Sequence, residues 1–98
     1  MVRKVVWSFR ARDDRKQILA YWTGRNKSSA YSKKLDELLR EAVRLIVKHP
    51  HIGKQTNEKN VRIKIVRHYL MIYEVADATI YIHALWDSRQ DPEKLKRP

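Results

Sequence analysis

Cationic side chains recur along the most strand-like part of this chain, at a spacing that can direct them onto one anionic surface. Arg62 and Lys64 alternate with Val61, Ile63 and Ile65. Residues two apart on a strand share a face, so both cations are expected to point the same way. A solvated face of an antiparallel sheet would show the same pattern. The pattern therefore predicts a shared cationic face and leaves its use open.

Two further side chains near the end of this region are candidates for chemistry. Arg89 lies between Asp87 and Asp91, where its guanidinium can meet a phosphate or a partner carboxylate, or form a structural ion pair. His83 lies on the last strand-like segment, and an imidazole can transfer protons near neutral pH. It is the best acid–base candidate of the four histidines, with a structural role as the alternative.

Composition bounds the class of protein. The 98 residues carry 22 Lys and Arg against 11 Asp and Glu, a net charge of +11, and no cysteine. A chain of this length is expected to form one domain, residues 1–98. The charge predicts a polyanionic partner, either nucleic acid or an acidic protein. The N-terminus lacks the apolar core of a signal peptide and no segment is long enough to cross a membrane, so we expect a soluble, cytoplasmic protein.

No cofactor or metal is expected. His49 and His51 flank Pro50, but a zinc site needs at least three protein ligands. Only two glycines are present, so no glycine-rich phosphate loop is available.

Periodicity predicts the elements that position these residues. We expect a strand over 2–7, a helix from a Ser8 cap to about residue 23, a helix over about 30–48, and a polar loop over 51–60. Three antiparallel strands follow over 61–66, 69–75 and 79–86, and Asp91 and Pro92 are expected to start a terminal turn. The order β-α-α-β-β-β predicts an α+β fold, an antiparallel sheet covered on one face by an antiparallel helical hairpin.

The second helix is expected to pack its apolar stripe on that sheet. The residues predicted to meet in the core are Leu38, Leu39, Ala42, Leu45, Ile46, Ile63, Ile65, Ile72, Ile80 and Ile82. Four aromatic residues, Trp7, Tyr21, Trp22 and Trp86, are also expected in the core.

Taken together, four segments resemble a known family. They are VVWSFRARDDRKQILAYW, KHPHIGK, VRIKIVRHYLMIYEV and ALWDSRQDPEKL. In their order and spacing, from about Arg3 to Leu95, the chain resembles the RelE/ParE superfamily of toxins from bacterial type II toxin–antitoxin systems. The DSRQDPEKL ending and the aromatic-rich first helix are closer to the ParE-like branch.

This resemblance implies both partners and a target. A cognate acidic antitoxin would bind the toxin as a hetero-oligomer. A ParE-like member would inhibit DNA gyrase, whereas a RelE-like member would be a ribosome-dependent endoribonuclease that cuts messenger RNA. A non-toxic basic module that binds nucleic acid is a further alternative.

The two branches also differ in the site residues that the resemblance implies. Arg62, Lys64 and Arg89 match basic residues that hold the scissile phosphate in RelE-like nucleases. Leu70 and Leu95 stand where that branch has an arginine and a tyrosine. The resemblance therefore favours inhibition by binding over cleavage.

Overall fold

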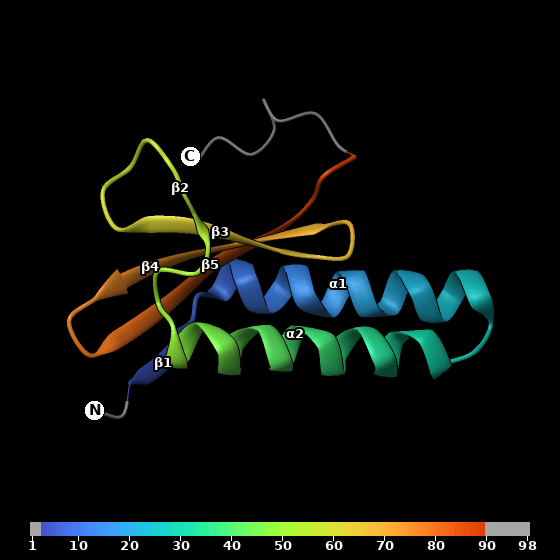
Figure 1. The fold of residues 1–98 in the computed structure, drawn as a ribbon. Helices are drawn as coiled ribbons and strands as arrows, with labels where there is room; N and C mark the ends of the chain where they lie inside the picture. The colour runs from blue at the N-terminus through green and yellow to red at the C-terminus, as the bar shows by residue number, and fades with distance from the viewer. Residues whose placement is uncertain (1–2, 90–98) are drawn as a thin grey trace.

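The computed structural model describes residues 3–89, which form a five-stranded sheet with two helices packed against one face (Figure 1). The elements are β1 (Lys4–Trp7), α1 (Phe9–Asn26), α2 (Ala30–Lys48), β2 (Lys54–Gln55), β3 (Val61–Val66), β4 (Tyr69–Ala76) and β5 (Thr79–Asp87). The strand order across the sheet is β1-β5-β4-β3-β2. The predicted α+β class is confirmed. The expected turn at Asp91 and Pro92, and Leu95, lie outside the described residues.

Helix α1 begins directly after Ser8, the residue predicted to cap it. The Ser8 hydroxyl accepts a hydrogen bond from the backbone N–H of Ala11 (3.0 Å) and donates one to the carbonyl of His83 on β5 (2.9 Å). The first bond satisfies one of the orphan donors of a helix N-terminus. The helix continues to Asn26, past the expected end, and Lys27 closes it in a left-handed conformation at φ 52°. The double role of Ser8 fixes the start of α1 against the sheet.

Helix α2 follows its apolar stripe as predicted. Leu35, Leu39, Ala42 and Ile46 are buried, and these residues recur every three or four positions along one face. Three of them pack in the main core with Met71, Tyr73, Ile80 and Ile82 of the sheet. The predicted core residues Leu38 and Leu45 are only half-buried, because they lie at the edges of the stripe.

Two features of the sheet differ from the predicted antiparallel arrangement. Strand β1 pairs with β5 in parallel, with Val5 opposite Ile80 and Trp7 opposite Ile82. A short connection forces antiparallel pairing, but β1 and β5 are separated by the rest of the chain, which leaves their orientation free. The expected loop over 51–60 also contains β2, which pairs with β3 at the sheet edge. Its residues, Lys54 and Gln55, are exposed and polar and give no strand pattern.

The face of β3 that meets the helices is the opposite of the one predicted. Val66 packs in the main core under the helices, so Arg62 and Lys64, which alternate with it, lie on that same face. Ile63 belongs to a second cluster on the other face, and Ile65 is 65% exposed. We call the two surfaces the helix-side face and the distal face. None of the described helices is long and apolar enough to cross a membrane.

Candidate functional site

Arg62 supports a loop in this structure. Its Nη1 donates to the carbonyls of His51 (3.1 Å) and Gly53 (2.8 Å), which hold the segment after α2 against β3. The buried Tyr73 hydroxyl reinforces this segment, donating to the carbonyl of Pro50 (2.7 Å) and accepting from the N–H of Gly53 (3.0 Å). Burial raises the pKa of that phenol, so it remains a donor. Part of the cation's hydrogen-bonding capacity is therefore used within the protein.

Gly53 is required at this point of the loop. A Cβ atom there would lie 2.6 Å from the Tyr73 hydroxyl oxygen and 2.9 Å from the carbonyl oxygen of Ile63. No side chain fits without a shift of the backbone or of the buried ring. The loop and its two anchors thus form one packed unit.

Lys64 is on the same face as Arg62, as predicted, but in a different setting. It borders a hollow of about 280 Å³ between α2 and β3, whose other lining residues include Leu38, Leu45 and Glu41. Lys64 makes no ion pair with another described residue. Its ammonium is the freer of the two strand cations.

Arg89 is held by a carboxylate of its own chain. Its Nε and Nη2 donate to the two oxygens of Asp87 at 3.0 and 2.8 Å, and its backbone N–H donates to the same side chain at 2.9 Å. The hydrogen bonds from Arg89 hold the pKa of Asp87 below its usual value. A paired guanidinium of this kind offers less net charge to a phosphate, and the geometry agrees with a structural ion pair.

His83 lies on the distal face, away from the other three candidates. The β4–β5 register shifts between Ile72, which faces Ala84, and Tyr73, which faces Ile82, so His83 has no residue opposite it. This bulge places His83 beside Glu74, with Nε2 and Oε1 2.8 Å apart. The ring also stacks on Tyr81, with centroids 6.4 Å apart. The structure therefore brings Arg62 and Lys64 to one face and separates His83 from them.

The residues on the distal face show whether it could bind a phosphoryl group. Register places the following residues on it: Val61, Ile63, Ile65, Leu70, Ile72, Glu74, Tyr81, His83, Ala84 and Trp86. Across β3, β4 and β5 these described residues include no Lys or Arg. At the edges of the sheet, register adds Lys54 of β2, opposite Ile63, and Lys4 of β1, opposite Thr79, to this face. An electrostatic clamp for a phosphoryl group needs cations aimed at the developing charge, and the three central strands do not supply them on this face.

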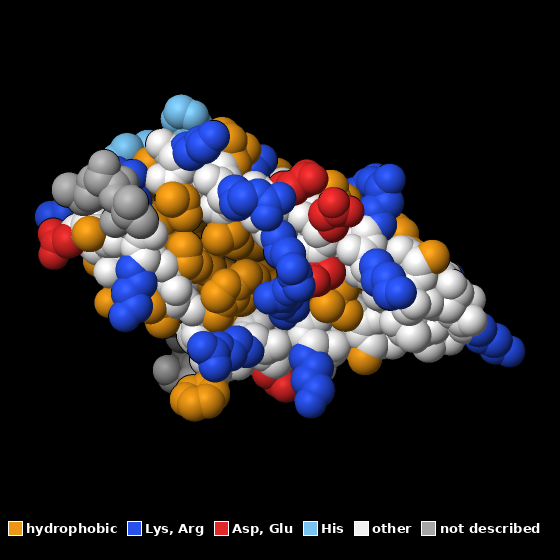
Figure 2. All heavy atoms as spheres, turned by 90° about the horizontal axis from the view of Figure 1, so that it is seen from below, with side chains coloured by type: hydrophobic (Ala, Val, Ile, Leu, Met, Phe, Trp, Pro, Cys, Tyr) orange, Lys and Arg blue, Asp and Glu red, His pale blue; other side chains and the backbone are white. Residues whose placement is uncertain are grey.

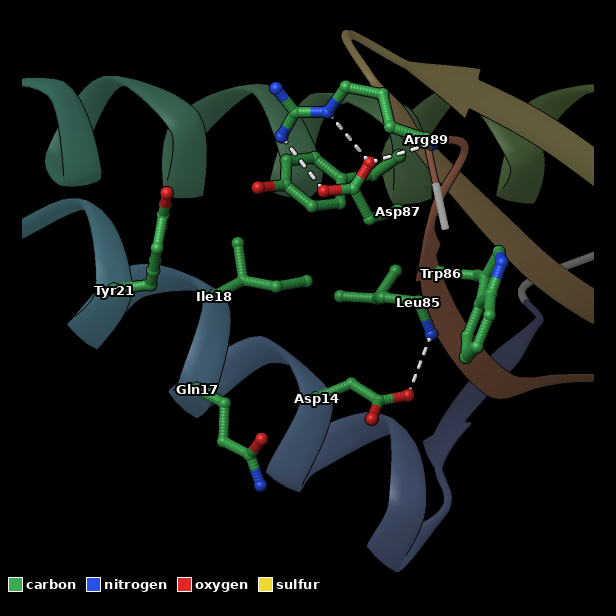
Figure 3. Close-up of a pocket in the computed structure, with 9 residues that line it drawn as sticks. Asp14, Gln17, Ile18, Tyr21, Leu85, Trp86, Asp87 and Arg89 are labelled. Carbon is green, nitrogen blue, oxygen red and sulfur yellow. Dashed lines mark hydrogen bonds and ion pairs between the residues drawn. The ribbon is translucent and has the colours of Figure 1, made fainter. Parts of the chain in front are cut away.

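A hollow of about 440 Å³ opens between α1 and the end of β5, and few sequence features indicated it (Figure 3). Asp14, Gln17 and Tyr21 line it from α1, and Trp86 and Asp87 from β5. Asp14 accepts a hydrogen bond from the N–H of Leu85 (3.1 Å), and burial raises the pKa of its carboxyl. The feature of the sequence that could have indicated this hollow is Asp14, a carboxylate on α1 between the apolar residues Ala11 and Ile18.

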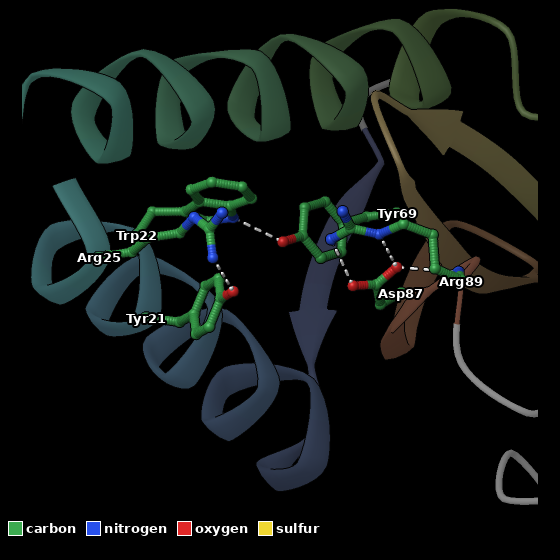
Figure 4. A network of polar contacts seen from close by, with 6 residues as sticks. All are labelled: Tyr21, Trp22, Arg25, Tyr69, Asp87 and Arg89. Carbon is green, nitrogen blue, oxygen red and sulfur yellow. Dashed lines mark hydrogen bonds and ion pairs between the residues drawn. The ribbon is translucent and has the colours of Figure 1, made fainter.

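The aromatic residues at this end form a polar network (Figure 4). Trp22 Nε1 donates to the hydroxyl of Tyr69 (2.7 Å), and Arg25 Nη1 donates to the hydroxyl of Tyr21 (3.3 Å). Burial raises the pKa of Tyr69. The prediction that Tyr21 is a core residue is wrong: it is 53% exposed. With two carboxylates beside one paired guanidinium, the hollow is not built to hold an anion.

Solved structures share this architecture. A chain from "Chromosomal ParDE TA system from P. aeruginosa" superposes with a TM-score of 0.74 at 16% identity, covering 88% of this chain and 96% of that chain. A chain of the E. coli DinJ–YafQ toxin–antitoxin complex gives a TM-score of 0.57 at 12% identity, covering 89% and 93%. YafQ from E. coli strain BL21(DE3) gives 0.54 at 13%, covering 87% and 92%. At these identities the likeness shows the fold.

The class of protein follows from this fold and from the sequence. A helical hairpin on one face of a five-stranded sheet is the fold that this chain shares with these solved structures. Residues 5–92 match the family described as ParE toxin of type II toxin-antitoxin system, parDE. The chain belongs to this family. No curated protein sequence matches it.

Proposed function

We propose that this protein is the toxin of a type II toxin–antitoxin pair and that it acts by binding and inhibiting DNA gyrase. Membership of the ParE family supports the first part. Inhibition by binding, the second part, is supported by the observation that the candidate catalytic residues do not converge on one site. Arg62 holds a loop, Arg89 is paired with Asp87, and His83 lies on the other face of the sheet from Arg62. A mechanism of inhibition by binding needs no convergent catalytic set.

An antitoxin partner is the second element of the proposal. The similar structures include a ParDE system and a DinJ–YafQ complex, and the net charge of +11 favours an acidic partner. Binding to the native state raises its stability by mass action. Co-expression with a small acidic protein encoded by an adjacent gene, followed by size exclusion, should give one complex with a raised melting temperature. Separate elution of the two proteins at low salt would count against this partner.

Measurements on expressing cells and on the purified protein test the mode of action. We expect expression of the toxin to stop DNA replication and cause filamentation while messenger RNA stays intact, and the purified protein to inhibit gyrase supercoiling. Primer extension checks the alternative, a ribosome-dependent endoribonuclease. Cuts in phase with codons that disappear in Arg89→Ala, together with unaffected supercoiling, would replace the gyrase proposal with the nuclease.

Variants of the strand cations make this test sharper. In a nuclease that uses Arg62, Lys64 and Arg89, alanine at Lys64 should reduce cleavage by about tenfold or more. Arg62→Ala alone is not decisive, because it also releases the loop at His51 and Gly53. Lys64→Ala, which breaks no ion pair with a described residue, is therefore the better probe. We expect it to leave growth inhibition unchanged.

A further inference from the structure

The positive charge of this protein is concentrated on its helical hairpin. Residues 9–48 carry 11 Lys and Arg against five Asp and Glu, a net charge of +6. Residues 49–89, a segment of nearly equal length, carry six against four, a net charge of +2. The field that attracts polyanions is therefore centred on the helices.

Three of the five acidic side chains of the hairpin accept hydrogen bonds within the protein, Asp13 from the side-chain amide of Gln17 and Asp14 and Asp36 as follows. The carboxylate of Asp36 accepts from Arg15 Nε (2.7 Å) and Arg40 Nε (3.1 Å), so this group of three retains a net positive charge. Asp14 accepts from the Leu85 N–H and lies 3.7 Å from Arg10. These contacts pair part of the negative charge of the hairpin with its own cations, and cations remain in excess.

The remaining cations of the hairpin are exposed and available. Arg12, Lys16, Arg44 and Lys48 are exposed and make no ion pair with another described residue. Figure 2 shows Lys and Arg side chains spread over the face that carries both helices, around an apolar hollow. The acidic residues between the α2 cations are Glu37 and Glu41, which lower the net charge of this surface without cancelling it.

Spacing along the helices suits a regular polyanion. On α2 the cations Arg40, Arg44 and Lys48 recur every four residues, about 6 Å of helix rise per step. Arg12 and Lys16 have the same spacing on α1. Phosphates on one strand of duplex DNA advance about 3.4 Å each along the axis, so alternate phosphates advance about 6.8 Å along that axis. The two repeats are close enough for several cations to contact one backbone.

We propose that the outer surface of the helical hairpin binds the phosphate backbone of double-stranded DNA without sequence preference. Arg12, Lys16, Arg44 and Lys48 supply the contacts, and the Asp36-linked pair Arg15 and Arg40 adds a fixed charge between the helices. Backbone contacts of this type release counterions and supply essentially all of non-specific affinity. The binding is separate from inhibition of gyrase and requires no catalytic residue.

A matched pair of charge variants tests the proposal. The hairpin variant is Lys16→Gln, Arg44→Gln and Lys48→Gln. The control is Lys54→Gln, Lys59→Gln and Arg67→Gln. It also removes two lysines and one arginine, but from exposed positions outside the hairpin. Fluorescence anisotropy with a labelled 20-base-pair duplex of mixed sequence, at about 50 to 200 mM salt, gives affinity and its salt dependence.

We expect the hairpin variant to bind at least about tenfold more weakly and its log–log salt slope to fall by about 2–3, because each lost phosphate contact contributes about 0.9. The control should keep nearly the full slope. Circular dichroism melting should show both variants folded, since none of the six side chains is buried. Equal losses in the two variants would overturn the proposal, because overall charge rather than the hairpin would then govern binding.

Two other outcomes would also overturn it. If polyglutamate of equal charge binds as tightly as the duplex and loses the same affinity in the hairpin variant, the surface is one for acidic protein. If single-stranded DNA binds more tightly than duplex and Phe9→Ala abolishes this preference, bases stack on Phe9, which is 91% exposed on the same side of α1 as Arg12 and Lys16. Gyrase assays on the same variants show separately whether the proposed function stands.

Discussion

Removing the hydroxyl of Tyr73 tests whether the loop after α2 is held as described. Tyr73 is fully buried, and Tyr73→Phe keeps the ring and its packing while deleting one oxygen. That oxygen makes two hydrogen bonds, to the carbonyl of Pro50 and from the N–H of Gly53. The change therefore isolates a pair of polar contacts in the interior.

The expected cost follows from those contacts. Each hydrogen bond contributes a net of about 0.5–1.5 kcal/mol, and a buried partner left unsatisfied costs about 1–3 kcal/mol. The bonds from Arg62 to the same loop remain in the variant, so the loop should stay in place. We expect the free energy of unfolding to fall by about 2 kcal/mol.

Urea unfolding followed by circular dichroism measures this loss. With an m-value of about 1–3 kcal/mol per molar, a loss of about 2 kcal/mol moves the midpoint by about 0.7–2 M at unchanged slope. Tyr81→Phe is the matched control, because Tyr81 is 38% exposed and its hydroxyl makes no hydrogen bond with a described residue. It should change stability by less than about 0.5 kcal/mol. Coincident midpoints for the two variants would refute the account of the loop.

Packing and ionisation provide two further predictions. Leu39→Ala should lower the free energy of unfolding by about 2–5 kcal/mol, since Leu39 is fully buried, whereas Ile65→Ala should cost under about 1 kcal/mol; similar urea midpoints for the two would contradict the assigned faces. Asp14 has a raised pKa, so its ionisation costs stability as pH rises through the folded pKa, and Asp14→Asn should stabilise the protein at pH 7 relative to pH 3. Asp87 has a lowered pKa, so its contribution is present above the unfolded value of 3.8 and is lost as pH falls through the folded pKa. Asp87→Asn should thus destabilise at pH 7 more than at pH 3, and urea titrations that give both variants the same sign of pH dependence would be inconsistent with these environments.

The sequence alone was sufficient for the class and for every element except β2. The Ser8 cap, the apolar stripe of α2 and the three strands that follow are local patterns, and the structure confirms each of them. The pairing of β3, β4 and β5 was equally accessible, because short connections leave only antiparallel neighbours. The resemblance to the RelE/ParE superfamily depended on the order of these segments and is confirmed by the family match.

Assigning the faces of the sheet required the tertiary structure. Alternation on β3 shows that Val61, Ile63 and Ile65 share a face, but it does not show which face the helices cover. Only the packing of Val66 under the hairpin places Arg62 and Lys64 there as well. The bulge that turns His83 toward Glu74 adds one residue to β5 and leaves no mark in the pattern.

Contacts between distant segments likewise could not be predicted from the sequence. Arg62 is bound by carbonyls nine and eleven residues away, and any residue can supply a carbonyl, so no side-chain motif marks the site. Asp14 meets a backbone N–H 71 residues later. Sequence determines which side chains carry charge and which share an element. The tertiary structure decides whether a charge is satisfied within the fold or left for a partner, because that depends on the atoms that distant segments bring to it.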